Sequence, residues 1–119
     1  MAMPLAKIRV LDLTQVQAGT YGSMILGDLG AEVIKIESPQ GDITRRFPFY
    51  RHKGESYYYL AFNRNKKGMV LNLKSSKGRE IFYDLVKIAD VVFDNYSPGV
   101  MESLGIDYDT VNKINSRII

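Results

Sequence analysis

The chain has 119 residues, which is enough for one small domain, and its apolar content is ordinary for a soluble globular protein. It has no cysteine and one histidine, which excludes disulfides, thiolate metal sites and a multi-histidine metal site; the lack of cysteine fits a cytoplasmic protein. The net charge is only +3. No apolar run approaches the roughly 20 residues that a membrane span needs, so we expect no membrane span. The first residues lack a long apolar stretch, so we also expect no secretory signal.

The basic residues are unevenly distributed along the chain. Ten of the sixteen lie between Arg45 and Arg79, where Glu55 is the only acid. Such a stretch attracts a polyanion, which could be nucleic acid, a nucleotide phosphate or an acidic partner. The simpler interpretation is a solvated basic face.

The first predicted elements form a βαβ unit. An apolar strand over Ile8–Leu13 is followed by a helix over Thr20–Leu29 and a second apolar strand over Glu32–Glu37. We expect Thr20 to cap the helix and Gly30 to take the left-handed turn at its end. A ligand of such a unit usually lies where the first strand ends and the helix begins, because free backbone N–H groups point outward there. This places three residues next to a ligand: Val16, Gln17 and Ala18.

The middle of the chain is difficult to interpret. Between Ile43 and Lys67 seven aromatic residues alternate with cations. The aromatic density argues against disorder, so we expect a long, ordered, loop-rich excursion.

The second half continues the alternation of strands and helices. We predict a strand over Gly68–Leu73, a helix that opens at Ser75 and continues through Val86, and a strand over Ala89–Phe93. The order implies an α/β fold with a parallel, doubly wound sheet.

The last residues continue the same pattern. After a turn over Asn95–Gly99 and a short helix to about Leu104, we expect Asp107 to cap a last helix through Ile114. Arg117–Ile119 has the composition of a fifth strand. That strand would be cut off as it begins, so we expect the 119 residues to be a fragment of a longer chain.

Nucleotide fingerprints are absent. The glycines after the first strand do not fit G-x-G-x-x-G, although Glu37 ends the second strand where an acid could bind a ribose hydroxyl. The chain also lacks the G-x-x-x-x-G-K-[ST] loop. These absences argue against binding of NAD.

Five segments, in order and together, carry a more specific pattern. They are Asp12–Gly19, Gly30–Asp42, Phe62–Lys67, Leu71–Lys74 and Ala89–Gly99. In this pattern the chain resembles the family III CoA-transferases (CaiB/BaiF family), which include formyl-CoA transferase, carnitine CoA-transferase and the α-methylacyl-CoA racemases. The resemblance covers nearly the whole chain.

The resemblance implies a fold and an assembly. Family members have a large domain with a Rossmann-like parallel sheet, flanking helices and no dinucleotide fingerprint, and full-length chains form interlocked homodimers. Residues 1–119 would be the N-terminal part of that large, coenzyme A-binding domain, with the remainder of the domain and the small domain absent. Coenzyme A is the implied co-substrate, no metal is implied, and the partners are acyl-CoA and carboxylate substrates.

The resemblance also implies a mechanism. An aspartate attacks the acyl-CoA thioester to give a mixed anhydride, CoA thiolate converts this to an enzyme-bound thioester, and the acceptor carboxylate takes the CoA. No aspartate of this chain has the sequence context of that nucleophile. We therefore expect these 119 residues to be inactive by themselves.

What the resemblance assigns to this chain is the coenzyme A side of the site. Gln17 matches the glutamine whose amide faces the reacting carbonyl, where it can stabilise an oxyanion. The residues matching coenzyme A contacts are Val16, Gln17, Ala18, Leu71, Asn72, Leu73, Lys74, Asn95, Tyr96 and Ser97.

Two departures from the family pattern concern phosphate binding. Arginines that many relatives carry are replaced by Ser38-Pro39 after the second strand and by Ser103 in the short helix. One hypothesis is that other cations supply the missing charge; the candidates are Arg45, Arg46, Arg64 and Lys67.

Three alternatives stay open. A racemase would usually lack Gln17 and have a shorter middle loop, so the sequence favours a transferase. A nucleic-acid-binding module would use the aromatic and cationic Arg45–Arg79 region, but there is no recognised RNA-binding motif and coenzyme A phosphates account for the charge equally well. The chain could also be a stable folding piece with no activity.

Overall fold

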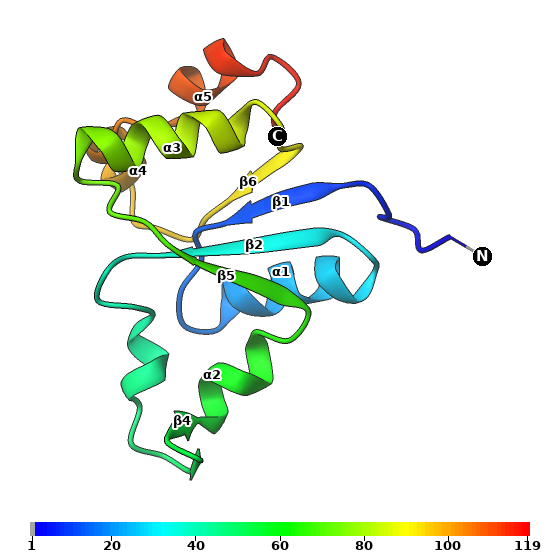
Figure 1. Cartoon of the computed structure of the whole chain (residues 1–119), viewed down its shortest axis with the longest axis vertical. Helices are drawn as coiled ribbons and strands as arrows, with labels where there is room; N and C mark the ends of the chain where they lie inside the picture. Colours follow the sequence, from blue (N-terminus) through cyan, green and yellow to red (C-terminus); the bar gives the residue numbers. More distant parts are fainter. Residues whose placement is uncertain (1) are drawn as a thin grey trace.

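The computed structural model describes residues 2–119 and contains a four-stranded parallel sheet. The strands are β1 (Arg9–Asp12), β2 (Glu32–Glu37), β5 (Lys66–Val70) and β6 (Val91–Phe93), in the spatial order β5-β2-β1-β6. Figure 1 shows the helices in two layers around this sheet. Helices α1 (Ala18–Asp28) and α2 (Tyr57–Phe62) lie on one side, and α3 (Ser76–Val86), α4 (Val100–Leu104) and α5 (Tyr108–Ile114) on the other. The predicted α/β fold is confirmed.

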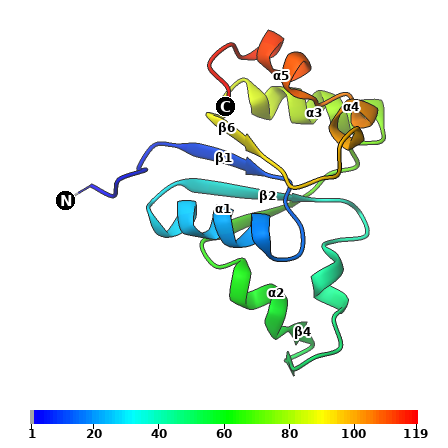
Figure 2. The same cartoon turned by 180° about the vertical axis from the view of Figure 1, so that it is seen from behind.

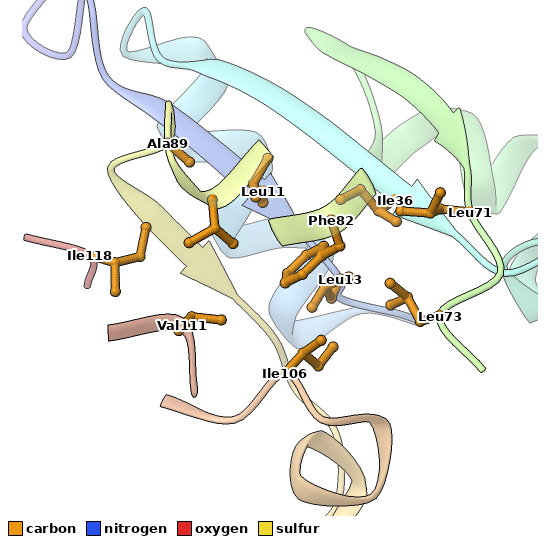
Figure 3. Close-up of a cluster of buried hydrophobic side chains, with 11 residues drawn as sticks. Leu11, Leu13, Ile36, Leu71, Leu73, Phe82, Ala89, Ile106, Val111 and Ile118 are labelled. Carbon is orange, nitrogen blue, oxygen red and sulfur yellow. The ribbon is translucent and has the colours of Figure 1, made fainter. Parts of the chain in front are cut away.

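Both faces of the sheet are covered, so the apolar side chains of its central strands are buried on either side. Val10 and Val33 are paired neighbours whose side chains pack with Ala31 and Leu26 on the α1 side. Alternate residues point to the other side, where they form the larger core around Phe82 of α3 (Figure 3). That core includes Leu11, Leu13, Ile36, Leu71, Leu73, Ile106, Val111 and Ile118.

Helix α1 begins two residues earlier than predicted. Gln17 is its N-cap residue, and the predicted cap, Thr20, lies inside the first turn. The Thr20 hydroxyl donates backward, to the carbonyl oxygens of Val16 (2.6 Å) and Gln17 (3.0 Å). The prediction of Thr20 as the cap was wrong because Val16, with φ = 65°, turns the chain into the helix before that point. Gly30 has φ = 100°, so the left-handed turn after α1 is confirmed.

Strand β5 also begins earlier than predicted, at Lys66 instead of Gly68, and it ends at Val70. The Lys66 side chain is only 2% exposed because it forms an ion pair with buried Asp12. Lys66, whose charge suggested a surface position, is therefore an internal residue of β5. Leu71 still donates its N–H to the Glu37 carbonyl (2.8 Å) before the chain turns away and buries Leu71 and Leu73 beneath α3.

The middle excursion is ordered and contains more regular structure than predicted. It forms a 3₁₀ helix, η1 (Ile43–Arg46), a small hairpin of β3 (Arg51–His52) and β4 (Glu55–Ser56), and then α2. Asp42 caps η1 and Ser56 caps α2. Short-range caps and contacts between tilted aromatic rings, including Phe47 with Tyr58, stabilise these elements. Neither kind of contact follows a simple period in the sequence.

The C-terminal helices follow the predicted caps, and the last strand does not form. Asp107 caps α5 through the N–H of Thr110, as predicted. Helix α3 opens within the predicted segment, where Ser75 caps it through the N–H of Gly78. Residues 117–119 are not a strand, although Ile119 exchanges backbone hydrogen bonds with Asp90 and Val92 along β6. Within residues 2–119, no helix combines the length and apolarity that crossing a membrane demands.

Candidate functional site

The carboxyl ends of the four parallel strands lie at one edge of the sheet, and the candidate residues follow three of them (Figure 2). Residues 13–17 follow β1, residues 71–75 follow β5 and residues 94–99 follow β6. Open α/β sheets bind ligands at this edge. Seven of the ten sequence-predicted contact residues line two separate places, a pocket and a shallower hollow.

The first place, which we call the strand-end pocket, is a cavity of about 220 Å³ at the ends of β2, β5 and β6. Its wall is largely apolar, and Lys74 is its only cation among the described residues. Burial raises the pKa of the Tyr96 hydroxyl, which therefore stays protonated as a hydrogen-bond donor. The lining consists of Ile36, Glu37, Ser38, Pro39, Gln40, Leu71, Asn72, Leu73, Lys74, Tyr96, Val100, Ser103 and Leu104.

Five of the ten predicted contact residues line the strand-end pocket: Leu71, Asn72, Leu73, Lys74 and Tyr96. Pro39 and Ser103, the positions at which the resemblance led us to expect arginines, belong to the same wall. Ser97 is exposed on the following turn and is outside the lining.

The second place, the Gln17 hollow, lies at the start of α1 and is lined by Gln17, Ala18, Tyr21 and Phe62. The Tyr58 hydroxyl donates to Gln17 Oε1 at 3.2 Å. This contact occupies the oxygen end of the amide, and the N–H₂ end has no hydrogen-bond partner among residues 2–119. Tyr58 was not predicted as a site residue, because nothing in the aromatic excursion marks one tyrosine above the others.

The backbone at the start of α1 is exposed to a ligand. Gln17 makes no side-chain cap, and Val16, Gln17 and Ala18 are all exposed. Uncapped N–H groups at a helix N-terminus favour an anion or a developing negative charge. Gly19 lets this turn fold tightly, since a Cβ atom there would lie 2.6 Å from Thr14 Cγ2.

Two buried ion pairs lie beneath this loop. Lys66 Nζ is 3.0 Å from Asp12 Oδ2, and Lys35 Nζ is 3.0 Å from Asp42 Oδ2. Lys35 also donates to the Thr14 carbonyl oxygen at 2.8 Å. Burial lowers the pKa of Lys66, and the Asp12 carboxylate opposes that shift. Charged residues within otherwise apolar strands are a sequence signal for such pairs, because a buried charge requires a partner.

The candidate replacements for the missing arginines lie elsewhere or are already paired. Arg45 binds both carboxylate oxygens of Glu37 and its guanidinium lies 3.7 Å above the Tyr59 ring. Arg64 pairs with Asp28, and Lys67 with Glu32, both near the amino end of β2 and away from the strand-end pocket. Arg46 is exposed in η1. Lys66 is internal, so it does not belong to the basic surface that the charge count suggested.

Glu37 is held as a carboxylate at the end of β2. Burial alone would raise its pKa, but hydrogen bonds from Arg45, the Asp42 N–H and the Tyr59 hydroxyl, together with the Arg45 charge, lower it to about 2. The pKa of Tyr59 is raised by burial and by its hydrogen bond to this carboxylate. The Glu37 carboxylate, through Arg45 of η1 and Tyr59 of α2, connects these two helices to the end of the sheet that carries the strand-end pocket.

Comparisons with known proteins agree with this architecture. The chain is 47% identical to succinyl-CoA:glutarate CoA-transferase of Mus musculus, in an alignment that covers 98% of the chain and 27% of that protein. It is 42% identical to formyl-CoA:oxalate CoA-transferase of Streptomyces coelicolor, covering 99% of the chain and 29% of the relative. The chain thus spans less than a third of the length of these relatives.

Solved structures show the same fold. A CaiB/BaiF family protein from Brucella suis superposes with a TM-score of 0.88 at 38% identity, covering 97% of this chain and 32% of the other. A protein from Mycobacterium tuberculosis superposes with a TM-score of 0.91, also at 38% identity, covering 99% and 32%. The family model described as CoA-transferase family III matches residues 5–119. The chain therefore belongs to CoA-transferase family III.

Proposed function

We propose that these residues form the coenzyme A side of an enzyme that transfers CoA from an acyl-CoA to a carboxylic acid. The observation that carries the proposal is the meeting of predicted contact residues from distant parts of the chain in one pocket. Leu71–Lys74 and Tyr96 line it, and Asn95, next to Tyr96 in the chain, hydrogen-bonds the loop that leads to Gln17. Relatives with this segment include a succinyl-CoA:glutarate and a formyl-CoA:oxalate CoA-transferase.

In the proposed complex, coenzyme A lies along the carboxyl edge of the sheet. Its nucleotide end contacts the strand-end pocket, where the apolar wall suits an adenine ring and Lys74 suits a phosphate. Its thioester end reaches the Gln17 hollow. The exposed backbone of Val16 and Ala18 would bind the chain between these two ends, and Ser97 would contact it from the β6 side.

Gln17 would act on the reacting carbonyl. A nucleophilic aspartate from outside these 119 residues attacks the thioester carbon. The C–S bond breaks and CoA leaves as a thiolate, so the acyl group stays on the aspartate as a mixed anhydride. Negative charge collects on the carbonyl oxygen during this attack, and the Gln17 N–H₂ group can donate to it. CoA thiolate then attacks the aspartyl carbonyl of the anhydride and releases the donor carboxylate. The acceptor carboxylate attacks the aspartyl-CoA thioester and expels CoA thiolate, which finally attacks the acceptor acyl carbonyl of the second anhydride and frees the aspartate. Each attack places negative charge on a carbonyl oxygen, and the Gln17 amide can donate to each such oxygen within its reach.

The alternatives are less favoured. By the family resemblance, a racemase would usually lack the glutamine that stands here at position 17. A nucleic-acid-binding module would need a free basic surface, but Lys66 is internal and Arg45, Arg64 and Lys67 are paired with carboxylates. We further propose that the full-length protein is a cytoplasmic homodimer, on the strength of the family resemblance.

The test uses the longest natural chain that contains these residues, because relatives extend well beyond them. Acyl-CoA and carboxylic acid pairs, starting with succinyl-CoA and glutarate, are assayed for the new CoA thioester by chromatography. Lys74→Ala should raise the KM for the acyl-CoA about threefold to tenfold, as expected for one charge-assisted phosphate contact. Lys113→Ala, a lysine on α5 away from the pocket, is the matched control.

Two results would contradict the proposal. One is the absence of both transfer activity and coenzyme A binding by calorimetry across the tested pairs. The other is a salt-sensitive mobility shift with an oligonucleotide in a protein that ignores coenzyme A, which would favour the nucleic-acid module.

A further inference from the structure

We propose that Asn95 is a positioning residue that fixes the Gln17 loop, and that its side chain is not a coenzyme A ligand. The inference rests on the proposed function for its effect on catalysis. It starts from a hydrogen-bond pattern that sequence comparison does not show. The side chain of Asn95 binds the backbone of one residue, Gln15, at both ends of its amide.

Two hydrogen bonds join the Asn95 side chain to the Gln15 backbone, and we call this pair of bonds the clamp. The Gln15 N–H donates to Asn95 Oδ1 at 2.9 Å, and Asn95 Nδ2 donates to the Gln15 carbonyl oxygen at 2.8 Å. The two residues are 80 positions apart, on the loops after β1 and β6. An amide that satisfies both backbone groups of one residue fixes that residue's orientation as well as its position.

The clamp acts directly before the strained point of the loop. Val16 has φ = 65°, a conformation that is costly for a β-branched residue and persists only where its surroundings hold it. Side chains from β2, the loop after β6 and α1 hold the neighbouring backbone groups. Lys35 binds the Thr14 carbonyl, Asn95 binds Gln15, and Thr20 binds the Val16 carbonyl.

Close packing supports the same role. A Cβ atom on Gly19 would lie 3.0 Å from Asn95 Cγ, so the amide rests against the first turn of α1. Asn95 therefore contacts the loop before Gln17 and the helix after it. Because Tyr96 of the strand-end pocket is its neighbour in the chain, the clamp sets the distance between that pocket and the Gln17 amide.

Tyr96 and Asn95 are adjacent in the chain but have different roles. Tyr96 lines the pocket, whereas the Asn95 amide is outside that lining and binds the Gln15 backbone through both its oxygen and its nitrogen. Loss of the clamp should let Val16 relax toward negative φ, which moves Gln17 away from the reacting carbonyl. Misplacement of a catalytic group by about 1 Å is enough to lower the rate about a hundredfold.

The experiment compares Asn95→Ala and Asn95→Asp with Asn112→Ala in the longest natural chain. Asp keeps an acceptor for the Gln15 N–H but places a second oxygen against the Gln15 carbonyl. Asn112, a half-buried asparagine on α5, is the matched control. Two quantities are measured, the steady-state constants for CoA transfer and the hydrogen–deuterium exchange of the peptide covering residues 13–20.

We expect both Asn95 variants to lower kcat about tenfold to a hundredfold, because Gln17 is misplaced. The KM for the acyl-CoA should change less than about threefold, since the strand-end pocket keeps its lining and a lost interaction made only in the transition state appears in kcat. Exchange in residues 13–20 should become at least about tenfold faster, as expected for a local opening that loses two hydrogen bonds. Asn112→Ala should change none of these.

Two outcomes would overturn the inference. One is exchange in residues 13–20 that matches the Asn112→Ala control. The other is a raised KM with unchanged kcat, which would make Asn95 a direct ligand. Should the wild-type protein show no CoA transfer, the proposed function fails, and the exchange measurement still decides whether Asn95 holds the loop. If Asn95→Ala does not fold, Asn95→Asp provides the same comparison.

Discussion

The ammonium group of Lys66 lies 3.0 Å from the carboxylate of Asp12, and neither side chain is more than 2% exposed. The pair spans the width of β2, because β5 and β1 are not neighbours in the sheet. Lys66 also donates to the Thr20 carbonyl and the Ser23 hydroxyl in α1. One buried cation thus joins the far strand, the end of β1 and the helix whose N-terminus carries Gln17.

Lys66→Met should destabilise the protein by about 3–5 kcal/mol, because it leaves the Asp12 carboxylate buried without its cation. Equilibrium unfolding in urea measures the change. The adjacent variant Lys67→Met removes a lysine whose ion pair with Glu32 is at the surface, and it should leave stability within experimental error. Equal losses of unfolding free energy in the two variants would mean that the buried Lys66–Asp12 pair stabilises the protein no more than the surface Lys67–Glu32 pair.

The Glu37 carboxylate should make stability depend on pH in the acid range. Its pKa is about 2 in the folded protein, below the ordinary value of 4.5, so the folded state binds fewer protons than the unfolded state. The resulting stabilisation is complete above pH 4.5 and is lost as pH falls toward 2, by about 2–3 kcal/mol down to pH 2.5. Urea unfolding at several pH values tests this, and Glu37→Gln should flatten that part of the curve. A variant with the wild-type slope would assign the effect to other carboxylates.

Tyr58→Phe should lower kcat for CoA transfer several-fold. The variant keeps the ring contacts with Phe47 and Phe62 but removes the hydroxyl that binds Gln17 Oε1, so the amide can rotate its oxygen toward the substrate. Tyr57→Phe, at an exposed neighbouring ring, is the control. In a Gln17→Ala background the Tyr58→Phe change should have no further effect; an equal effect there would show that Tyr58 acts independently of Gln17.

Gly19→Ala should destabilise the protein even though alanine favours helices over glycine by about 1 kcal/mol. The new methyl group would lie 2.6 Å from Thr14 Cγ2 and 3.0 Å from Asn95 Cγ, and Thr14 is buried and cannot retreat. Overpacking of this kind costs about 1–3 kcal/mol, and here it also moves the Gln17 loop.

Gly68→Ala is the matched control for this change, since open space surrounds that position in β5. Thermal unfolding of the two variants separates the effects. A Gly19→Ala protein as stable and as active as the wild type would mean that the loop accommodates the methyl group.

Much of the fold could be read from local patterns. The alternation of apolar strands with amphipathic helices predicts the parallel sheet, and Gly30, Ser75 and Asp107 mark helix ends by short-range chemistry that needs no tertiary contact. The segment resemblance likewise depends on residue identity and spacing alone. The boundaries of α1 and β5 were missed because distant partners decide them, Asp12 for β5 among them.

By itself, then, the sequence determined the order of strands and helices, the three strand ends that hold the candidate residues, and the family. Only the tertiary structure decided which charges are internal, which amide is bonded through its oxygen to a tyrosine and which amide binds the backbone. Lys66, Gln17 and Asn95 all illustrate this. The reason is physical: the role of a polar side chain depends on the partner that satisfies it, and these partners lie far away in the sequence.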